Sequence, residues 1–181
     1  IRAMGEGFGD RLFYLTAKTI TRTVAEEAVL ILKKKGLKFK AITLTAKEKM
    51  CILDEPVCDP LHCPRAKGHF DRINAAVYEM LTEGDSYTRE EVLCQAEKWK
   101  VCPHELQFDV ASWIDGVICD YNYAFDPTSK LKRFFSEGTK GDYIFLIDEA
   151  HNLVERGRDM FSATLIKEDI LKIRQLLRPY A

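Results

Sequence analysis

The chain has 181 residues, 46% of them hydrophobic, and a formal net charge of −1. This length suits one ordinary domain with a small insertion, and the hydrophobic content is enough to bury a core. No apolar run approaches the length of a membrane span and the N-terminus is not a signal peptide, so we expect no membrane partner. The near-neutral total does not exclude a nucleic-acid partner, because a local basic face is compatible with it.

The first third of the chain predicts strand, helix and strand in succession. Residues 11–19 predict a buried strand ending in a polar turn, and residues 20–36 predict a helix. The apolar residues of this helix recur at helical spacing and are Val24, Ala28, Ile31 and Leu32. Residues 38–46 predict a second strand. Strand, helix and strand at this spacing indicate a parallel sheet.

The pattern changes between Lys47 and Cys102, where no strong strand signal occurs. Residues 69–84 predict a helix. Its apolar side is Phe70, Ile73, Val77 and Leu81. Residues 86–101 predict another helix, which Thr88 caps.

The sheet resumes in the second half of the chain. Residues 115–123 and 142–150 predict further strands, and residues 166–177 predict a final helix. The predicted fold class is therefore α/β, a parallel sheet with helices interrupted by a mainly helical, cysteine-bearing insertion.

The apolar run before Asp148 stops on two adjacent carboxylates, Asp148 and Glu149. Sheets of this class place their chemistry outside the carboxyl ends of strands. There, Asp148 can hold Mg²⁺ through water, Glu149 can orient or deprotonate an attacking water, and His151 can report the γ-phosphate state to another site. A solvated acidic turn is the alternative. Four apolar residues followed by Asp-Glu-Ala-His, however, resemble the signature of DEAH-type superfamily-two helicases, which favours catalysis.

A nucleotide-hydrolysis site also needs a loop that grips phosphates, and no G-x-x-x-x-G-K-[ST] occurs in the sequence. The Gly-rich residues 5–10 lack the Lys-Ser/Thr that should follow and are a poor substitute. The chain also starts at Ile1 without a Met. We therefore expect a piece of a longer protein whose phosphate loop lies upstream, and we expect the piece alone to be inactive.

Four of the cysteines form a set, Cys51, Cys58, Cys63 and Cys102. Three lie in one Pro-rich loop, which lets thiolates converge at little loop-closure cost, and the fourth returns from a distance. Four thiolates suit a [4Fe–4S] cluster or zinc. The spacing alone does not decide, although the lack of paired C-x-x-C knuckles leans towards iron. Cys94 and Cys119, within a predicted helix and strand, are interpreted as small buried hydrophobes.

Four segments carry a family resemblance in chain order. Residues 13–27, "FYLTAKTITRTVAEE", resemble helicase motif Ia, and "LTAKEKMC" at residues 44–51 is similar to a strand end leading into a first cluster cysteine. "VCPHE" at residues 101–105 is similar to the Cys-Pro that supplies the fourth, and "DYNYAFDP" at residues 120–127 to the segment before the DEAH box. Together they resemble the XPD/DinG family of iron–sulfur superfamily-two DNA helicases, most closely its bacterial XPD-like branch.

The resemblance implies a parent enzyme that couples ATP hydrolysis, with Mg²⁺ at Asp148, to 5′→3′ translocation on single-stranded or forked DNA in repair. It implies a partial RecA-like fold of the P-loop NTPase type, a [4Fe–4S] cluster on the four cysteines, and a bacterial-type cytoplasmic, nucleoid-associated location. The expected RecA-like domain is residues 1–50 and 104–160, and the iron–sulfur insertion is residues 51–103. Residues 161–181 would begin an arch insertion or form a terminal helix.

Polar side chains at strand ends are the candidate DNA contacts, because a helicase tracks its strand through phosphates and stacking without reading base edges. The candidates are Thr16, Lys18 and Thr19 after the first strand, Thr45, Lys47 and Lys49 after the second, Asn122 before the DEAH box, and Arg65 and Lys67, with His69 and Arg72, beside the cysteines. Tyr78 or Phe70 could stack a base, although Phe70 at helical spacing is more often core. For each lysine the alternative is a solvated surface charge.

Two other classes of function stay open from sequence. One is a non-catalytic zinc- or cluster-binding nucleic-acid module, which the paired carboxylates argue against. The other is a redox protein that uses the cluster for electron transfer, which the DEAH string does not support.

Overall fold

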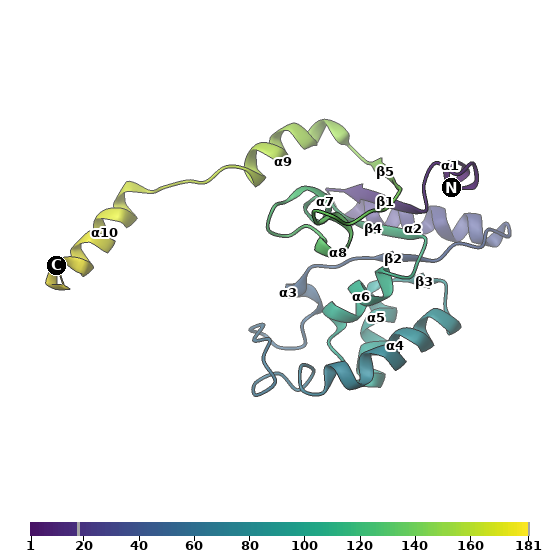
Figure 1. Cartoon of the computed structure of the whole chain (residues 1–181), viewed down its shortest axis with the longest axis horizontal. Coiled ribbons are helices and arrows are strands. Elements are labelled where there is room, and N and C mark those ends of the chain that lie inside the picture. The colour runs from purple at the N-terminus through teal and green to yellow at the C-terminus, as the bar shows by residue number, and fades with distance from the viewer. Residues whose placement is uncertain (18, 181) are drawn as a thin grey trace.

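The computed structural model of the chain describes residues 1–17 and 19–180, and its centre is a parallel β-sheet (Figure 1). The strands are β1 (Arg11–Thr16), β2 (Ala41–Thr43), β3 (Ser86–Tyr87), β4 (Gly116–Asp120) and β5 (Tyr143–Ile147). The α-helices are α1 (Arg2–Gly5), α2 (Thr19–Lys34), α3 (Lys47–Met50), α4 (His69–Glu83), α5 (Arg89–Trp99), α6 (Pro103–Ala111), α7 (Asn122–Phe125), α8 (Lys132–Phe135), α9 (Leu153–Met160) and α10 (Lys167–Leu177). Two short 3₁₀-helices are η1 (Ala150–Asn152) and η2 (Arg178–Tyr180).

The strands follow the order β3-β2-β4-β1-β5, and the pairings between them are parallel. Leu12 of β1 and Ala41 of β2 both lie opposite Gly116 of β4. A strand from late in the chain therefore separates the two strands of the predicted strand–helix–strand unit. This arrangement confirms the predicted fold class, an α/β protein with a partial RecA-like parallel sheet.

One face of the sheet builds the main core, because side chains alternate between the two faces along each strand. Phe13, Val117 and Ile42 share a register and are buried on this face. They belong to one cluster with buried residues of α4, α5 and α6. The helical segment is thus anchored on the sheet through a continuous apolar core (Figure 1).

The opposite face carries a smaller core under α2. Leu12, Phe39 and Ala41 form its buried cluster. Gly116 lies in the same register, where an added Cβ would come within 2.6 Å of the Phe39 ring. Any larger residue at that position would displace the ring.

The structure corrects the predicted apolar side of α2. Ala25 is buried, and Val29 packs on the smaller core. The residues predicted from helical spacing, Val24, Ala28, Ile31 and Leu32, are all exposed. Ala28 and Leu32 line one hollow with Ala25 and Val29, at the margin of the packed side of the helix.

The segment that contains α4 and α5 agrees with the two helices predicted from sequence, with three differences. Thr88 caps α5 through a capping box with Glu91, as predicted. Phe70, however, is 86% exposed, although the preceding residue His69, the first of α4, is buried. Cys94 is exposed, because it points away from the face that buries Val92. The short strand β3 was not predicted.

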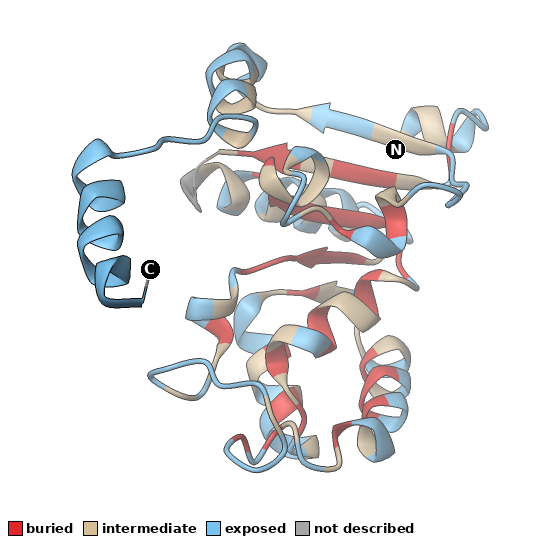
Figure 2. Ribbon diagram, turned by 60° about the vertical axis from the view of Figure 1, so that its left-hand side comes forward, coloured by how far each residue is buried: buried red, intermediate tan, exposed pale blue. Residues whose placement is uncertain are grey.

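The last part of the chain is the most exposed (Figure 2). On β5, Phe145 and Leu146 are 39% and 46% exposed. The helix α10, which confirms the predicted final helix, is exposed throughout and extends away from the sheet (Figures 1 and 2). No helix formed by the described residues has both the length and the apolar content needed to cross a membrane.

Candidate functional site at the carboxyl edge of the sheet

Functional side chains gather where the strands end, because parallel strands place their carboxyl ends at one edge of a sheet. Thr16 ends β1 and Asp120 ends β4. Thr45 comes two residues after β2, and Asp148 directly follows β5. The structure therefore brings the predicted acidic strand end and the predicted DNA contacts Thr16 and Thr45 to the same edge.

Asp148 and Glu149 form a tight turn after β5. The Asp148 N–H donates to the Leu15 carbonyl at 2.9 Å, which extends the β1–β5 ladder by one residue. Glu149 has a left-handed backbone, with φ of 50°, an uncommon conformation for a residue other than glycine. Its carbonyl accepts from the Asn152 N–H at 2.9 Å and so begins η1. Asp148 is half-buried and Glu149 is exposed, so the two carboxylates have different environments.

Tyr121 fastens this turn to the segment that follows β4. Its hydroxyl donates to the backbone carbonyl of Asp148 and lies 3.2 Å from that of Glu149. The Tyr121 side chain is fully buried. Burial raises the pKa of Tyr121, and the nearby carboxylates of Asp148 and Glu149 raise it further. The hydroxyl therefore keeps its proton and remains a donor to the turn.

His151 lies beside Glu149 on the outside of the turn. Its Nδ1 is 3.3 Å from Oε2 of Glu149, and the two side chains are 74% and 51% exposed. At such exposure the pair is a weak interaction. The structure thus places Asp148, Glu149 and His151 in one turn, and their catalytic roles stay a prediction.

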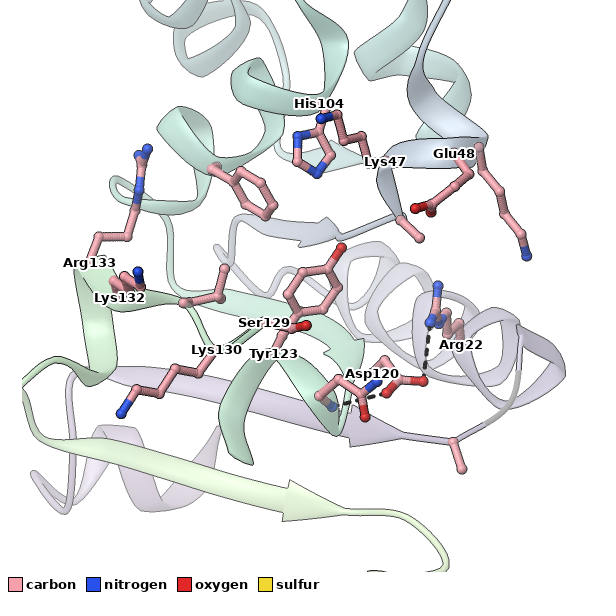
Figure 3. A pocket seen from close by; sticks show the side chains of 16 residues that line it. Arg22, Lys47, Glu48, His104, Asp120, Tyr123, Ser129, Lys130, Lys132 and Arg133 are labelled. Carbon is pink, nitrogen blue, oxygen red and sulfur yellow. Dashed lines mark hydrogen bonds and ion pairs between the residues drawn. The ribbon is translucent and has the colours of Figure 1, made fainter. Parts of the chain in front are cut away.

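A hollow of about 780 Å³, which we call the strand-end groove, opens at this edge (Figure 3). Its basic lining residues are Arg22, Lys47, Lys49, Lys130, Lys132 and Arg133, and its acidic ones are Glu48 and Asp120. Lys130, Lys132 and Arg133 lie towards one end, and Tyr123 lies between them and Arg22 (Figure 3). The excess of basic groups makes the groove suitable for a polyanion.

The predicted DNA contacts are only partly brought to this groove. Those that line it are Lys47, Lys49 and Asn122. Thr16 and Thr45 are buried at the strand ends, with 0% and 5% exposure. Lys18 lies outside the described residues, and so does the side chain of Thr19, the first residue of α2.

Arginines of the basic patch predicted beside the cysteines form hydrogen bonds and an ion pair within the protein. Arg65 is 8% exposed, its Nη1 donates to the Ala96 carbonyl at 2.9 Å, and its Nη2 pairs with Glu97. Arg72 donates to three backbone carbonyls, one of them that of Lys67. Lys67 itself is exposed. These bonds tie the cysteine loop to α5, and DNA contacts by Arg65 and Lys67 stay predictions.

The second wall of the groove was missed from sequence. It is formed by Lys130, Lys132 and Arg133, which lie in the run "SKLKR" after an Asp-Pro pair. That basic run was the available signal. Arg22 was also missed, although it lies in the segment that resembles motif Ia.

Two buried polar atoms at the groove have no hydrogen-bond partner among the described residues. They are Nε of Arg22 and Oδ1 of Asn122. Arg22 otherwise contacts Asp120, with Nη2 to Oδ2 at 3.8 Å, and donates from Nη1 to the Leu44 carbonyl at 3.3 Å. Because buried polar groups in proteins are nearly always paired, a water or a ligand atom would complete the hydrogen bonding of these two atoms.

Gln107 of α6 fixes the turn that carries Lys47. Gln107 is fully buried. Its Oε1 accepts from the Thr45 N–H and its Nε2 donates to the Thr45 carbonyl, both at 2.8 Å. The Tyr123 hydroxyl donates to the same carbonyl at 3.3 Å. The end of β2 is therefore held rigidly against α6 at the wall of the groove.

The predicted cluster cysteines all line one pocket of about 330 Å³, the cysteine pocket. They are Cys51, Cys58, Cys63 and Cys102. All of the cysteines lie in the described part of the chain as free thiols. A set of four thiols suits a thiolate-bound cluster or zinc. Within residues 1–17 and 19–180, however, no three His, Cys, Asp or Glu side chains are grouped closely enough to hold a metal ion. The four thiols therefore line one pocket, but in this arrangement they are not close enough together to bind one metal ion.

The cysteine pocket and the strand-end groove share a wall, because Lys47 and His104 line both. A side-chain hydrogen bond with Cys58 is the main cause that raises the pKa of Lys47. Burial raises the pKa of Cys102, while the backbone N–H groups at the start of α6 act in the opposite direction. The Cys102 N–H donates to Nδ1 of His69 at 3.2 Å, which orients the start of α6.

The remaining two cysteines lie elsewhere in the described chain. Cys119 is fully buried in β4, as predicted, and burial raises the pKa of its thiol. Cys94 is exposed, so the prediction that it is a buried hydrophobe was wrong.

Comparison with known proteins identifies relatives of the chain. Residues 15–170 match the DEAD_2 family. A stretch of 88 residues, 49% of this chain, is 27% identical to the Fanconi anemia group J protein homolog of Gallus gallus and covers 7% of it. A stretch of 81 residues, 45% of this chain, is 28% identical to the Regulator of telomere elongation helicase 1 homolog of Anopheles gambiae and covers 8% of it. The chain therefore spans only a small part of the length of these relatives.

A parallel sheet with helices, which carries an acidic turn and a basic groove at its carboxyl edge, defines an α/β protein of the partial RecA-like class. The chain belongs to the DEAD_2 family, the helicase domain of the XPD/DinG type. This confirms the family resemblance that the motifs predicted.

Proposed function

We propose that the chain is part of an ATP-dependent 5′→3′ DNA helicase of the iron–sulfur XPD/DinG type acting in DNA repair, and that the strand-end groove holds its single-stranded DNA. The observation that carries the proposal is the excess of basic over acidic side chains in a groove at the same carboxyl edge of the sheet as the acidic strand end. A motor that moves along DNA must bind phosphates at every sequence, and lysine and arginine supply such contacts.

Phosphate contacts in the groove would come from both walls. Lys47 and Lys49 stand on the wall formed after β2, and Lys130 and Lys132 on the wall formed after α7. Arg22 also lines the groove, and its guanidinium is a donor suited to a phosphate oxygen. Contacts to the DNA phosphates from two sides would hold a single DNA strand along the groove without reading its base sequence.

The acidic turn would supply the hydrolytic half of an ATPase. In this proposal Asp148 holds Mg²⁺ through water, Glu149 orients or deprotonates the attacking water, and His151 reports the nucleotide state. The sequence contains no phosphate-loop motif. We therefore expect this chain, purified alone, not to hydrolyse ATP in the presence of single-stranded DNA. DNA-stimulated release of phosphate, lost in Glu149→Gln, would overturn that expectation.

The four cysteines of the cysteine pocket would hold a [4Fe–4S] cluster, with zinc as the alternative metal. Support comes from their position on one pocket and from the wall that this pocket shares with the strand-end groove. A bound cluster would brace residues 51–103 against the groove. Residues 1–50 and 104–160 would then be the RecA-like part, and residues 161–181 the start of a further insertion.

Salt dependence of DNA binding tests the phosphate contacts. Fluorescence anisotropy with a labelled oligothymidine would measure Kd at several salt concentrations. Each phosphate contact to a single strand adds about 0.7 to the slope of log K against log salt, so Lys49→Gln/Lys132→Gln should reduce the slope by about 1.4. Both lysines are exposed and line the groove, so the substitutions should leave the fold intact.

The matched control is Lys34→Gln/Lys35→Gln, which removes the same charge from the exposed end of α2, away from the groove lining. It should leave the slope nearly unchanged. Equal losses in the two double variants would place the bound strand elsewhere, and the absence of any binding by the wild-type chain would sink the proposal.

A further inference from the structure

Three aromatic rings form a row along the strand-end groove. His104 and Phe108 lie one turn apart on α6, with centroids 4.7 Å apart and planes at 83°. Phe108 and Tyr123 follow at 5.9 Å and 68°. All three residues are half-buried and line the groove. The row spans from the wall of the cysteine pocket, where His104 lies, to the segment after β4.

These rings are held in place by the fold. The Tyr123 hydroxyl donates to the Thr45 carbonyl at 3.3 Å, and Nε2 of Gln107, the residue before Phe108 on α6, donates to the same carbonyl. Edge-to-face contacts fix Phe108 between its two neighbours. Burial raises the pKa of Tyr123 to about 12, so its ring stays neutral beside a polyanion. Rings fixed in advance lose little entropy when a ligand packs against them.

The charges flank the row of rings. Lys130 and Arg133 lie on one side of Tyr123, and Arg22 lies on the other (Figure 3). A groove with basic rims and an aromatic middle differs from a simple phosphate-binding patch, which needs no rings. It matches the arrangement by which proteins hold unpaired nucleic acid, with phosphates on cationic groups and bases on aromatic faces.

We propose that Phe108 and Tyr123 form a stacking surface for unpaired bases of a DNA strand whose phosphates lie on the basic rims. This rests on the proposed function, since it assigns the strand's orientation within the same groove. The bases face into the groove, and the sugar–phosphate backbone faces its rims. Stacking of this kind tolerates every base, because each has a π-face. Duplex DNA, whose bases are already stacked, cannot use the surface.

The stacking residues suggested by sequence lie outside the strand-end groove. Phe70 lines the cysteine pocket and is 86% exposed, and Tyr78 is 71% exposed on α4. Within the described chain, neither residue belongs to the lining of the strand-end groove.

Abasic DNA separates stacking from phosphate binding. Anisotropy would compare oligothymidine of about 12 nucleotides with an abasic strand of the same length, which keeps the phosphates and lacks the bases. The wild-type chain should bind the thymidine strand roughly 5- to 150-fold tighter for each stacked base. Phe108→Leu and Tyr123→Leu should each reduce that ratio. Lys49→Gln/Lys132→Gln should instead weaken both ligands equally.

Two further variants keep the test decisive if a leucine variant unfolds. Tyr123→Phe retains the ring and should retain the preference for thymidine. Phe108→Trp places a fluorophore in the groove, and oligothymidine, but not the abasic strand, should quench the emission that it adds to the wild-type signal. Equal wild-type affinity for the two strands overturns the stacking surface while leaving phosphate binding in place. Failure to bind either strand overturns the proposed function as well.

Discussion

The hydroxyl of Tyr121 donates a hydrogen bond to the backbone carbonyl of Asp148, which joins the segment after β4 to the acidic turn after β5. The two strands are not neighbours, because β1 lies between them. Tyr121 therefore reaches across a strand end, and this bond fixes the turn that carries both carboxylates.

Replacing Tyr121 by phenylalanine should destabilise this turn. The substitution keeps the buried ring and removes the donor to the Asp148 and Glu149 carbonyls. A buried acceptor that loses its partner costs about 1 to 3 kcal/mol. Urea unfolding should show a decrease of that size in the free energy of unfolding. Hydrogen exchange should also speed up at the Asp148 amide, which lies next to the freed carbonyls.

Tyr78→Phe is the control, because Tyr78 is 71% exposed and its substitution should change stability by less than about 0.5 kcal/mol. Equal stability of wild type and Tyr121→Phe would show that the hydroxyl does not hold the turn.

Gln107→Leu should loosen the wall of the strand-end groove. The amide of Gln107 satisfies both backbone groups of Thr45, and leucine of similar size satisfies neither. Tyr123 still donates to the carbonyl, so the N–H of Thr45 is the group left unpaired. The expected loss is about 2 to 3 kcal/mol in the free energy of unfolding, measured by chemical denaturation.

The matched substitution is Gln175→Leu on the exposed helix α10, which should be nearly neutral. If the two leucine variants unfold at the same urea concentration, the paired bonds to Thr45 contribute nothing to stability.

The strands were predictable from sequence because apolar runs and strand–helix–strand spacing are local signals. Their ends were less predictable. Residues 38–46 predicted one long strand, but β2 stops at Thr43 because Thr45 turns to bond with Gln107, a residue far along the chain. The prediction of the apolar face of α2 failed for a similar reason. Periodicity places apolar residues on one broad side of a helix, and only the packing partner decides which of them are covered.

The second wall of the groove depends on contacts between distant segments. The Leu131 N–H donates to the Tyr123 carbonyl at 2.8 Å, and Arg133 pairs with Asp109 of α6 at 2.7 Å. These bonds return residues 129–133 to the edge of the sheet. No local pattern in residues 129–133 indicates that this segment comes back to the sheet. The sequence therefore predicted the wall formed by Lys47 and Lys49 and not the wall formed by Lys130, Lys132 and Arg133. The aromatic row was hidden likewise, because α6 and α7 meet only in the fold.

The stability of the helical segment should depend on the charge of Glu79. Its carboxylate accepts from Lys98, the Trp99 indole and Gln95, and so joins α4 to α5. The bond to Lys98, and then that to Trp99, lowers the pKa of Glu79 in the folded chain. Because the pKa of Glu79 is lower in the folded chain than in the unfolded chain, its carboxylate stabilises the fold at pH values above the unfolded pKa. This contribution is lost as the pH falls through the pKa of the folded chain.

Thermal unfolding across about pH 5 to 3 would measure this effect. The midpoint of the wild-type chain should fall more steeply over that range than the midpoint of Glu79→Gln, which keeps an acceptor but cannot titrate. The variant should be the less stable of the two near pH 7, and the difference should shrink at low pH. Parallel curves for the two proteins would remove Glu79 from the acid sensitivity of the fold.

The cysteine pocket makes a separate prediction about metal. If Cys51, Cys58, Cys63 and Cys102 together hold a cluster, serine at any one of them removes a thiolate ligand and should lower the iron content. Cys94→Ser should retain iron, because Cys94 is exposed on α5 and lies outside the lining of the cysteine pocket in the described chain. Protein purified without oxygen would be assayed for iron, zinc and absorption near about 400 nm, where iron–sulfur clusters absorb and zinc does not. Zinc without that absorption would select the alternative metal. Equal iron loss in Cys94→Ser would mean that the four pocket cysteines are not the ligand set, because Cys94 lies outside the lining of their pocket.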